Sequence, residues 1–148
     1  MFTTAHRTVA VVGLRAAGAL LLAAAGAIHL YLWSTGYDSI AWIGPLFLVN
    51  AVAAVVLAVA VLTAPRRLLF WPAGAGALLQ IGTLGGLVLS STVGLFGFVE
   101  SSAASYYWES VIVESVGFLV LAALAGLCRP VRRSLVRDDG TEQVRAGG

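Results

Sequence analysis

The sequence predicts an all-α membrane protein built from four transmembrane helices. Hydrophobic residues make up 59% of the 148 positions and charged residues only 11%, which leaves too little polar surface to cover a water-soluble domain. Four continuous apolar stretches each supply about the 20 residues that a helix needs to cross a hydrocarbon core of about 30 Å. The strands of a membrane barrel would instead alternate apolar and polar residues. We therefore predict spans at residues 9–33, 40–63, 68–95 and 106–128.

The first predicted span, 9–33, also has features of a cleavable signal peptide, because Arg7 and Arg15 accompany an Ala/Leu run with small residues. The apolar stretch nevertheless starts at Val9, before Arg15, and continues to Trp33, which favours a retained span. Arg15 lies inside this apolar run. We expect its long side chain to reach back to the lipid headgroups.

Proline and glycine mark specific positions in the later spans. Pro45 falls in the first turns of the span 40–63, where a missing N–H donor costs least, so we expect it near a helix start. Gly82 and Gly86 form a GxxxG pair in the third span, and Gly117 lies in the fourth. Small residues let helices approach closely in lipid. We predict helix packing at these three glycines, either inside the bundle or against a partner.

The arginines predict how the chain crosses the membrane. All nine cationic residues are arginines, and none lies in the connections 34–39 and 96–105, which carry Asp38 and Glu100. Because cytoplasmic loops are enriched in cations, we expect both termini in the cytoplasm. Short connections between consecutive spans favour an up-down-up-down bundle. The arginines are Arg7, Arg15, Arg66, Arg67, Arg129, Arg132, Arg133, Arg137 and Arg145.

The predicted organisation is one four-span transmembrane domain, 1–128, followed by a basic and partly disordered cytoplasmic tail, 129–148. The longest connection, 96–105, contains Ser, Ala and Gly together with Glu100. We expect a polar surface turn or a short interfacial helix there. The alternative is a lid over a site.

Polar side chains inside the apolar spans form the candidate site. Ionisable groups are costly to bury in a membrane and usually face protein or water. His29 lies near the end of the first span and Glu114 about 12 Å into the fourth, so the two would meet if these spans are neighbours. We also expect Gln80 to bond across helices, with Asn50 as its partner. The candidate polar cavity comprises His29, Asn50, Ser91, Glu109 and Glu114.

Three interpretations of this polar set stay open. The side chains could satisfy one another and fix the helix register, line a proton-linked or solute-binding cavity open to the outside, or hold a metal ion. No paired His or Cys spacing favours a metal, so we predict no metal ligands. Cys128 is the single cysteine, which excludes a disulfide within the chain.

Catalytic and nucleic-acid motifs are absent from the sequence. Without a nucleophile elbow, phosphate loop or metalloprotease motif, we expect neither an enzyme nor a cofactor. The net charge is only +2, and Asp138 and Asp139 interrupt the arginines near the end of the chain. Such a charge distribution makes no extended basic surface, so nucleic acid is not an expected partner.

The leading functional prediction is a small polytopic protein of a bacterial plasma membrane, because lysine is absent while Ala, Gly and Arg are abundant. We predict a non-enzymatic accessory or assembly subunit that packs through small-residue helix faces. Its partners would be the lipid bilayer and either another membrane protein or a second copy. The alternative is a small transporter or solute-binding protein with an outward-facing polar cavity around His29, Asn50 and Glu114.

Overall fold

The computed structural model describes residues 2–130, and within them the chain is helical with short connections. Four helices are each long and apolar enough to cross a membrane, which confirms the prediction of an all-α protein with four candidate spans. The predicted tail, 129–148, lies outside the described residues from residue 131 onward. The helices are α1 (Phe2–Ser34), α2 (Ile43–Thr63), α3 (Phe70–Thr92) and α4 (Tyr107–Leu127), with a short 3-10 helix, η1 (Tyr37–Ser39).

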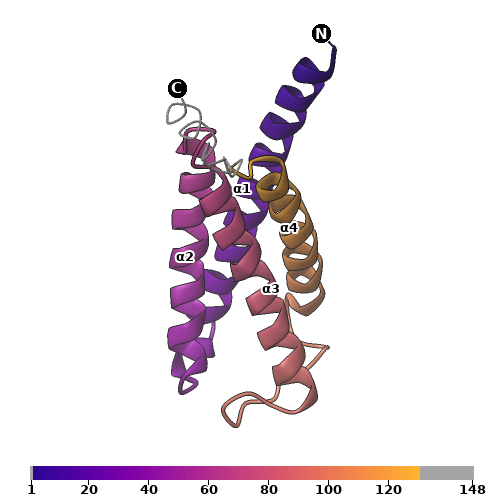
Figure 1. The fold of residues 1–148 in the computed structure, drawn as a ribbon. Helices are drawn as coiled ribbons and strands as arrows, with labels where there is room; N and C mark the ends of the chain where they lie inside the picture. The colour runs from indigo at the N-terminus through magenta and orange to yellow at the C-terminus, as the bar shows by residue number, and fades with distance from the viewer. Residues whose placement is uncertain (1, 131–148) are drawn as a thin grey trace, which may run out of the picture.

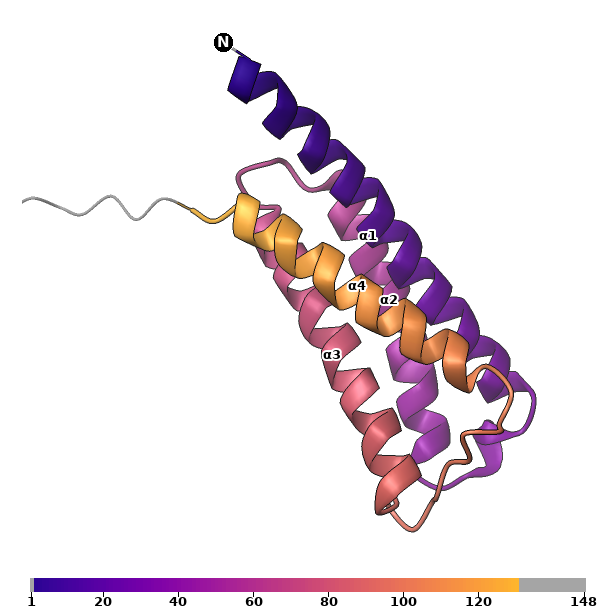
Figure 2. The ribbon, with the colours of Figure 1, turned by 90° about the vertical axis from the view of Figure 1, so that its right-hand side faces the viewer.

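The two ends of the bundle differ in which connections they carry (Figure 1). The connection 64–69 between α2 and α3 lies at one end, which we call the closed end, together with the last turn of α4. The η1 segment and the connection 93–106 lie at the opposite end, which we call the loop end. Figure 2 shows α1 extending beyond the other helices at the closed end.

The helices do not pack evenly around the bundle. α1 packs along both α2 and α4, and α3 packs along α4, whereas α3 has fewer contacts with α2 and very few with α1. In Figure 1, the distance between α2 and α3 widens toward the loop end, because α3 leans away from α2. This divergence creates the space described below.

The helix bounds differ from the predicted spans where the backbone turns. α3 ends at Thr92 rather than at residue 95, because Gly94 and Gly97 adopt φ angles of 85° and 81°. These angles belong to the left-handed region that glycine tolerates best. α2 starts at Ile43 rather than at residue 40, because η1 and its following turn occupy the preceding residues.

The core of the closed end is apolar and tightly packed. Leu22, Val61 and Leu121 are fully buried there. A Cβ atom at Gly18 would lie 2.7 Å from the Leu121 Cδ2 atom, and one at Gly76 would lie 3.1 Å from its Cδ1 atom. Because these two glycines have no side chains, they leave the space that the Leu121 side chain occupies.

Arg15 lies beside this core and corrects one expectation. Its guanidinium group donates hydrogen bonds to the carbonyl oxygens of Val61 and Ala64. These carbonyls belong to the C-terminal end of α2, where the helix leaves acceptors unpaired and cations are favoured. The side chain is therefore held by a neighbouring helix rather than directed to the lipid headgroups.

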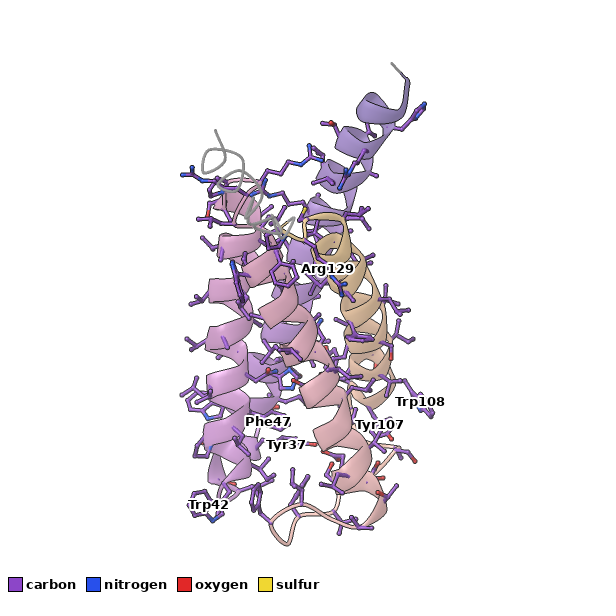
Figure 3. The ribbon with its side chains drawn as sticks, in the orientation of Figure 1. Tyr37, Trp42, Phe47, Tyr107, Trp108 and Arg129 are labelled. Atoms are coloured by element: carbon purple, nitrogen blue, oxygen red, sulfur yellow. The ribbon has the colours of Figure 1, made fainter. Side chains whose placement is uncertain are left out.

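Aromatic side chains point both into and out of the bundle. Figure 3 shows Trp42 and Trp108 on the outer surface, whereas Tyr37 and Phe47 lie between the helices near the loop end. Trp42 and Trp108 are exposed, at 69% and 61% of their surface. Exposed tryptophans near helix ends suit the interface of a bilayer with water.

Candidate functional site

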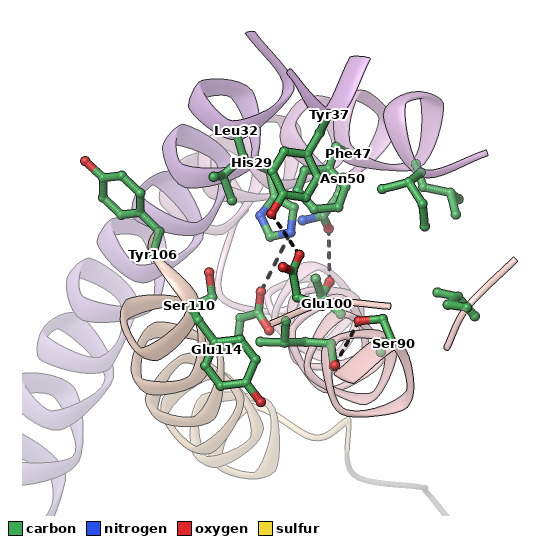
Figure 4. Close-up of a pocket in the computed structure, with 18 of the residues that line it drawn as sticks. His29, Leu32, Tyr37, Phe47, Asn50, Ser90, Glu100, Tyr106, Ser110 and Glu114 are labelled. Carbon is green, nitrogen blue, oxygen red and sulfur yellow. Dashed lines mark hydrogen bonds and ion pairs between the residues drawn. The ribbon is translucent and has the colours of Figure 1, made fainter. Parts of the chain in front are cut away.

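A cavity of about 420 Å³ lies at the loop end, and side chains from all four helices line it. Figure 4 shows that its polar side chains come from opposite walls and point toward a common centre. The volume falls in the range of about 300–1,000 Å³ that small-molecule sites occupy. The polar lining residues are His29, Tyr37, Asn50, Thr83, Ser90, Glu100, Ser105, Tyr106, Tyr107, Ser110 and Glu114.

His29 of α1 and Glu114 of α4 lie next to each other in the lining of this cavity, and both are buried. The His29 Nδ1 atom lies 2.9 Å from the carbonyl oxygen of Ala25. A carbonyl can only accept, so Nδ1 carries a proton, and Nε2 is an acceptor when the ring is neutral. Nε2 lies 3.8 Å from Glu114 Oε1, which is within the distance of an ion pair but longer than a hydrogen bond.

One carboxyl oxygen of Glu114 accepts no hydrogen bond from the described residues. The residue is 1% exposed, and its Oε2 atom has no hydrogen-bond partner among residues 2–130. Buried carboxylate oxygens are ordinarily paired, because leaving them unpaired is costly. This oxygen is therefore an unused acceptor on a residue that lines the cavity.

Asn50 lies on the α2 wall and is partly engaged. The Thr83 hydroxyl of α3 lies 3.2 Å from Asn50 Oδ1 and donates to it. The expected bond between Asn50 and Gln80 does not form, because Gln80 lies against Gly117 of α4. A Cβ atom at Gly117 would come within 2.3 Å of Gln80 Nε2. Gly117 thus packs closely against a neighbouring helix of the same chain.

An aromatic and acidic cluster covers the cavity at the loop end. The Tyr37 hydroxyl donates a hydrogen bond of 2.8 Å to Glu100 Oε2, which links η1 to the connection 93–106. Tyr37 stacks on Phe47 with ring centroids 4.9 Å apart, and Phe98 meets Tyr37 edge-on at 5.9 Å. We call Tyr37, Phe47, Phe98 and Glu100 the roof. Desolvation, followed by the Glu100 carboxylate, raises the pKa of Tyr37 to about 12.

The side of the cavity between α2 and α3 is open. Leu46 and Val49 of α2 and Leu78 of α3 line the cavity, yet they are 46%, 64% and 72% exposed. A side chain that borders both a cavity and the outer surface marks an opening. Because this surface belongs to two apolar membrane-crossing helices, the opening faces the region that lipid would occupy.

The candidate residues from the sequence fall into two groups. His29, Asn50 and Glu114 line the cavity, whereas Ser91 and Glu109 are not among its lining residues. The Ser91 hydroxyl donates to the Val88 carbonyl and lies 3.3 Å from the Tyr107 hydroxyl. The Glu109 side chain is exposed on the outer surface.

Gly82 and Gly86 occupy a different place from the one expected of a packing face inside the bundle. Both line the cavity. A Cβ atom built on either glycine would meet no described atom within 4 Å. The pair therefore leaves space rather than receiving a neighbouring helix of this chain.

Sequence reasoning did not single out the roof. Tyr37 reads as a membrane-interface tyrosine, and Glu100 as a solvated loop acid. A signal was present, since the arginine pattern assigns their two connections to the same side of the membrane. Their direct contact depends on loop conformation, which that pattern does not specify.

The four apolar helices and the cavity between them are those of a small integral membrane protein with a polar cavity between its candidate spans. Within the described part of the chain, no three His, Cys, Asp or Glu side chains cluster closely enough to hold a metal ion. No protein-family model, curated protein or solved structure matches the chain.

Proposed function

We propose that this protein binds a small ligand in the loop-end cavity, as a small transporter or solute-binding membrane protein. The observation that carries this proposal is the unpartnered carboxyl oxygen of Glu114, a residue that lines a cavity of about 420 Å³. Ionisable groups that face a cavity inside a membrane protein mark solute and proton paths.

Mutual satisfaction of the polar residues is less well supported. His29 Nε2 and Glu114 Oε1 are 3.8 Å apart, and Asn50 bonds to Thr83 instead of to either of them. A set of residues whose sole role was to fix helix register would pair its buried polar atoms. Glu114 Oε2 has no partner among the described residues, which favours a bound ligand.

The proposed topology is an up-down-up-down crossing of a bacterial plasma membrane with both termini in the cytoplasm. Arg66 and Arg67 lie in the connection at the closed end, and Asp38 and Glu100 lie at the loop end. By the positive-inside rule, the closed end then faces the cytoplasm and the roof faces outward. The absence of lysine supports a bacterial host.

An accessory-subunit role is the second candidate, and one surface favours it. Gly85 is exposed on α3, and a Cβ atom there would meet nothing within 4 Å among the described residues. An exposed glycine on an apolar helix can receive a second membrane helix. This face and the cavity are separate, so the two functions can be tested apart.

The test is native mass spectrometry of the full chain extracted gently from its own membrane. We expect the wild type to retain a small bound species. Gly86→Leu places a side chain in space that the ligand would occupy, and a loss of about 1.4 kcal/mol in binding should lower the ligand occupancy about tenfold. Gly85→Leu adds the same side chain one position away, on the outer surface, and should leave occupancy unchanged.

Other outcomes decide against this proposal. A wild-type spectrum without a small species, but with a second protein that Gly85→Leu removes, would establish the accessory role. A small species retained equally by both variants would assign its binding site to another part of the molecule.

A further inference from the structure

We propose that the cavity ligand is a lipophilic ammonium ion, whose N–H groups bind between His29 and Glu114 while its apolar body lies in the opening between α2 and α3. This inference rests on the proposed function and names the class of ligand. Four features of the cavity support it: its charge, its acceptors, its aromatic wall and its open side.

The charge of the lining selects against anions. Glu100 and Glu114 both line the cavity, and no arginine from residues 2–130 does. Lysine does not occur in the chain. A phosphate or carboxylate headgroup would therefore meet two acids and no fixed cation, which is unfavourable in a medium of low dielectric constant.

His29 and Glu114 offer hydrogen-bond acceptors to the cavity, so they favour a ligand with several donors. Nδ1 of His29 is occupied by the Ala25 carbonyl, so the neutral ring offers only the Nε2 lone pair to the cavity. Glu114 offers Oε1 at 3.8 Å from that nitrogen and the unpartnered Oε2. A ligand with donors beside these two acceptors would satisfy both of them. A protonated amine supplies several donors together with the opposite charge.

The aromatic rings of the roof provide a further surface for a cation. The Phe47 ring centroid lies 4.9 Å from that of His29, and the Tyr37 ring stacks on Phe47 with centroids 4.9 Å apart. Both residues line the cavity. Ring faces attract ammonium groups within about 6 Å, and more strongly where water is excluded.

The open side accounts for the lipophilic body. Leu46, Val49 and Leu78 line the cavity while remaining partly exposed on the outer surface. An apolar group in this opening would contact leucine and valine on one side and lipid on the other. A strongly hydrated small amine would gain nothing from this wall, so the site favours an apolar amine over a hydrophilic one.

The test compares three probes that share one rigid apolar cage: adamantylamine, adamantanol and adamantanecarboxylate. Their binding is measured by saturation-transfer NMR to the full chain in nanodiscs of zwitterionic phosphatidylcholine at neutral pH, with empty nanodiscs as the blank. We expect the amine to bind about tenfold to a hundredfold more tightly than the alcohol, because of its charge-assisted hydrogen bonds. The carboxylate should bind more weakly than the alcohol.

Matched variants locate the effect. Glu114→Gln keeps the size of the side chain and removes its charge, so the preference for the amine should disappear. Glu109→Gln makes the same change five residues earlier on the exposed face of α4, and it should keep the preference. Circular dichroism verifies that both variants are folded. If Glu114→Gln does not fold, the ranking of the three probes on the wild type still decides.

The proposal is overturned if the alcohol or the carboxylate binds as tightly as the amine, or if Glu109→Gln removes the preference as completely as Glu114→Gln. If a native species sensitive to Gly86→Leu is nevertheless retained, only the ligand class is wrong and the proposed function stands. If neither the probes nor a native species bind, both proposals fail, and the cavity holds water alone.

Discussion

The closed end and the loop end are built from the same four helices, and both carry glycines. The glycines pack closely at the closed end and border open space at the loop end. At the closed end, Gly18 and Gly76 leave room for the side chain of Leu121, and the interior is filled by fully buried leucines and Val61. At the loop end, Gly82 and Gly86 face open space, and the interior is a cavity with a buried histidine and glutamate.

This comparison shows that a glycine does not by itself specify close packing. Whether a glycine packs closely depends on the side chain that faces it from the neighbouring helix. Leu121 fills the space that the closed-end glycines leave, whereas the walls opposite Gly86 carry polar side chains and α3 leans away from α2. In lipid, where packing rather than water exclusion holds helices together, the two ends should therefore differ in their contributions to stability.

The largest expected effect is at the closed end. Leu121→Ala removes a fully buried side chain, and the resulting void should lower the free energy of unfolding by about 2–5 kcal/mol. Leu78→Ala, at a side chain that is 72% exposed, should change it by less than about 0.5 kcal/mol. Unfolding by sodium dodecyl sulfate in mixed bicelles, followed by circular dichroism, measures both. Equal losses would contradict the division into a packed and a hollow end.

A smaller effect is expected at Arg15, which joins α1 to the end of α2. Arg15→Gln removes the charge-assisted hydrogen bonds to the Val61 and Ala64 carbonyls and should cost about 1.5–3 kcal/mol. Arg15→Lys keeps the charge but cannot donate in a fork, so about half of that loss is expected. The same unfolding assay ranks the variants. A lysine variant as stable as the wild type would mean that charge alone matters.

The smallest effect concerns the roof and depends on pH. Because the pKa of Tyr37 is raised to about 12 from an unfolded value of about 10, the folded state holds the phenol proton more tightly. The resulting stability is complete below about pH 10 and is lost as the pH rises toward 12. Tyr37→Phe should lack this loss and be less stable at neutral pH by about 0.5–1 kcal/mol. Phenolate absorbance and unfolding, each followed across this pH range, measure the effect. A Tyr37 that ionises near pH 10 would show that the roof does not form.

The sequence predicts the helices well because lipid imposes one simple requirement, a long apolar run, on each of them. The ends of the helices were less predictable. The residues after Thr92 are apolar enough to extend α3, but Gly94 and Gly97 turn the backbone. That choice depends on contacts of the following connection, such as the Glu100 N–H bond to the Ser90 carbonyl of α3, rather than on hydropathy.

The candidate site was predictable to the extent that single residues reveal it. His29, Asn50 and Glu114 stand out as polar groups in apolar runs, and the structure brings them to one cavity. Ser91 and Glu109 stand out in the same way but lie outside its lining, because side-chain direction depends on the rotation of each helix. The void beside Gly82 and Gly86 could not be foreseen, since it results from the tilt between two helices.

The hydrogen bonds of Arg15 also bear on how the chain is assembled. Its two acceptors, the carbonyls of Val61 and Ala64, exist as free helix-end groups only after α2 has been synthesised and has ended. A nascent α1 alone must keep this cation in contact with water or headgroups. The smallest unit that satisfies the guanidinium is therefore the hairpin of α1 and α2, and biogenesis should deliver these two helices to the bilayer as a pair.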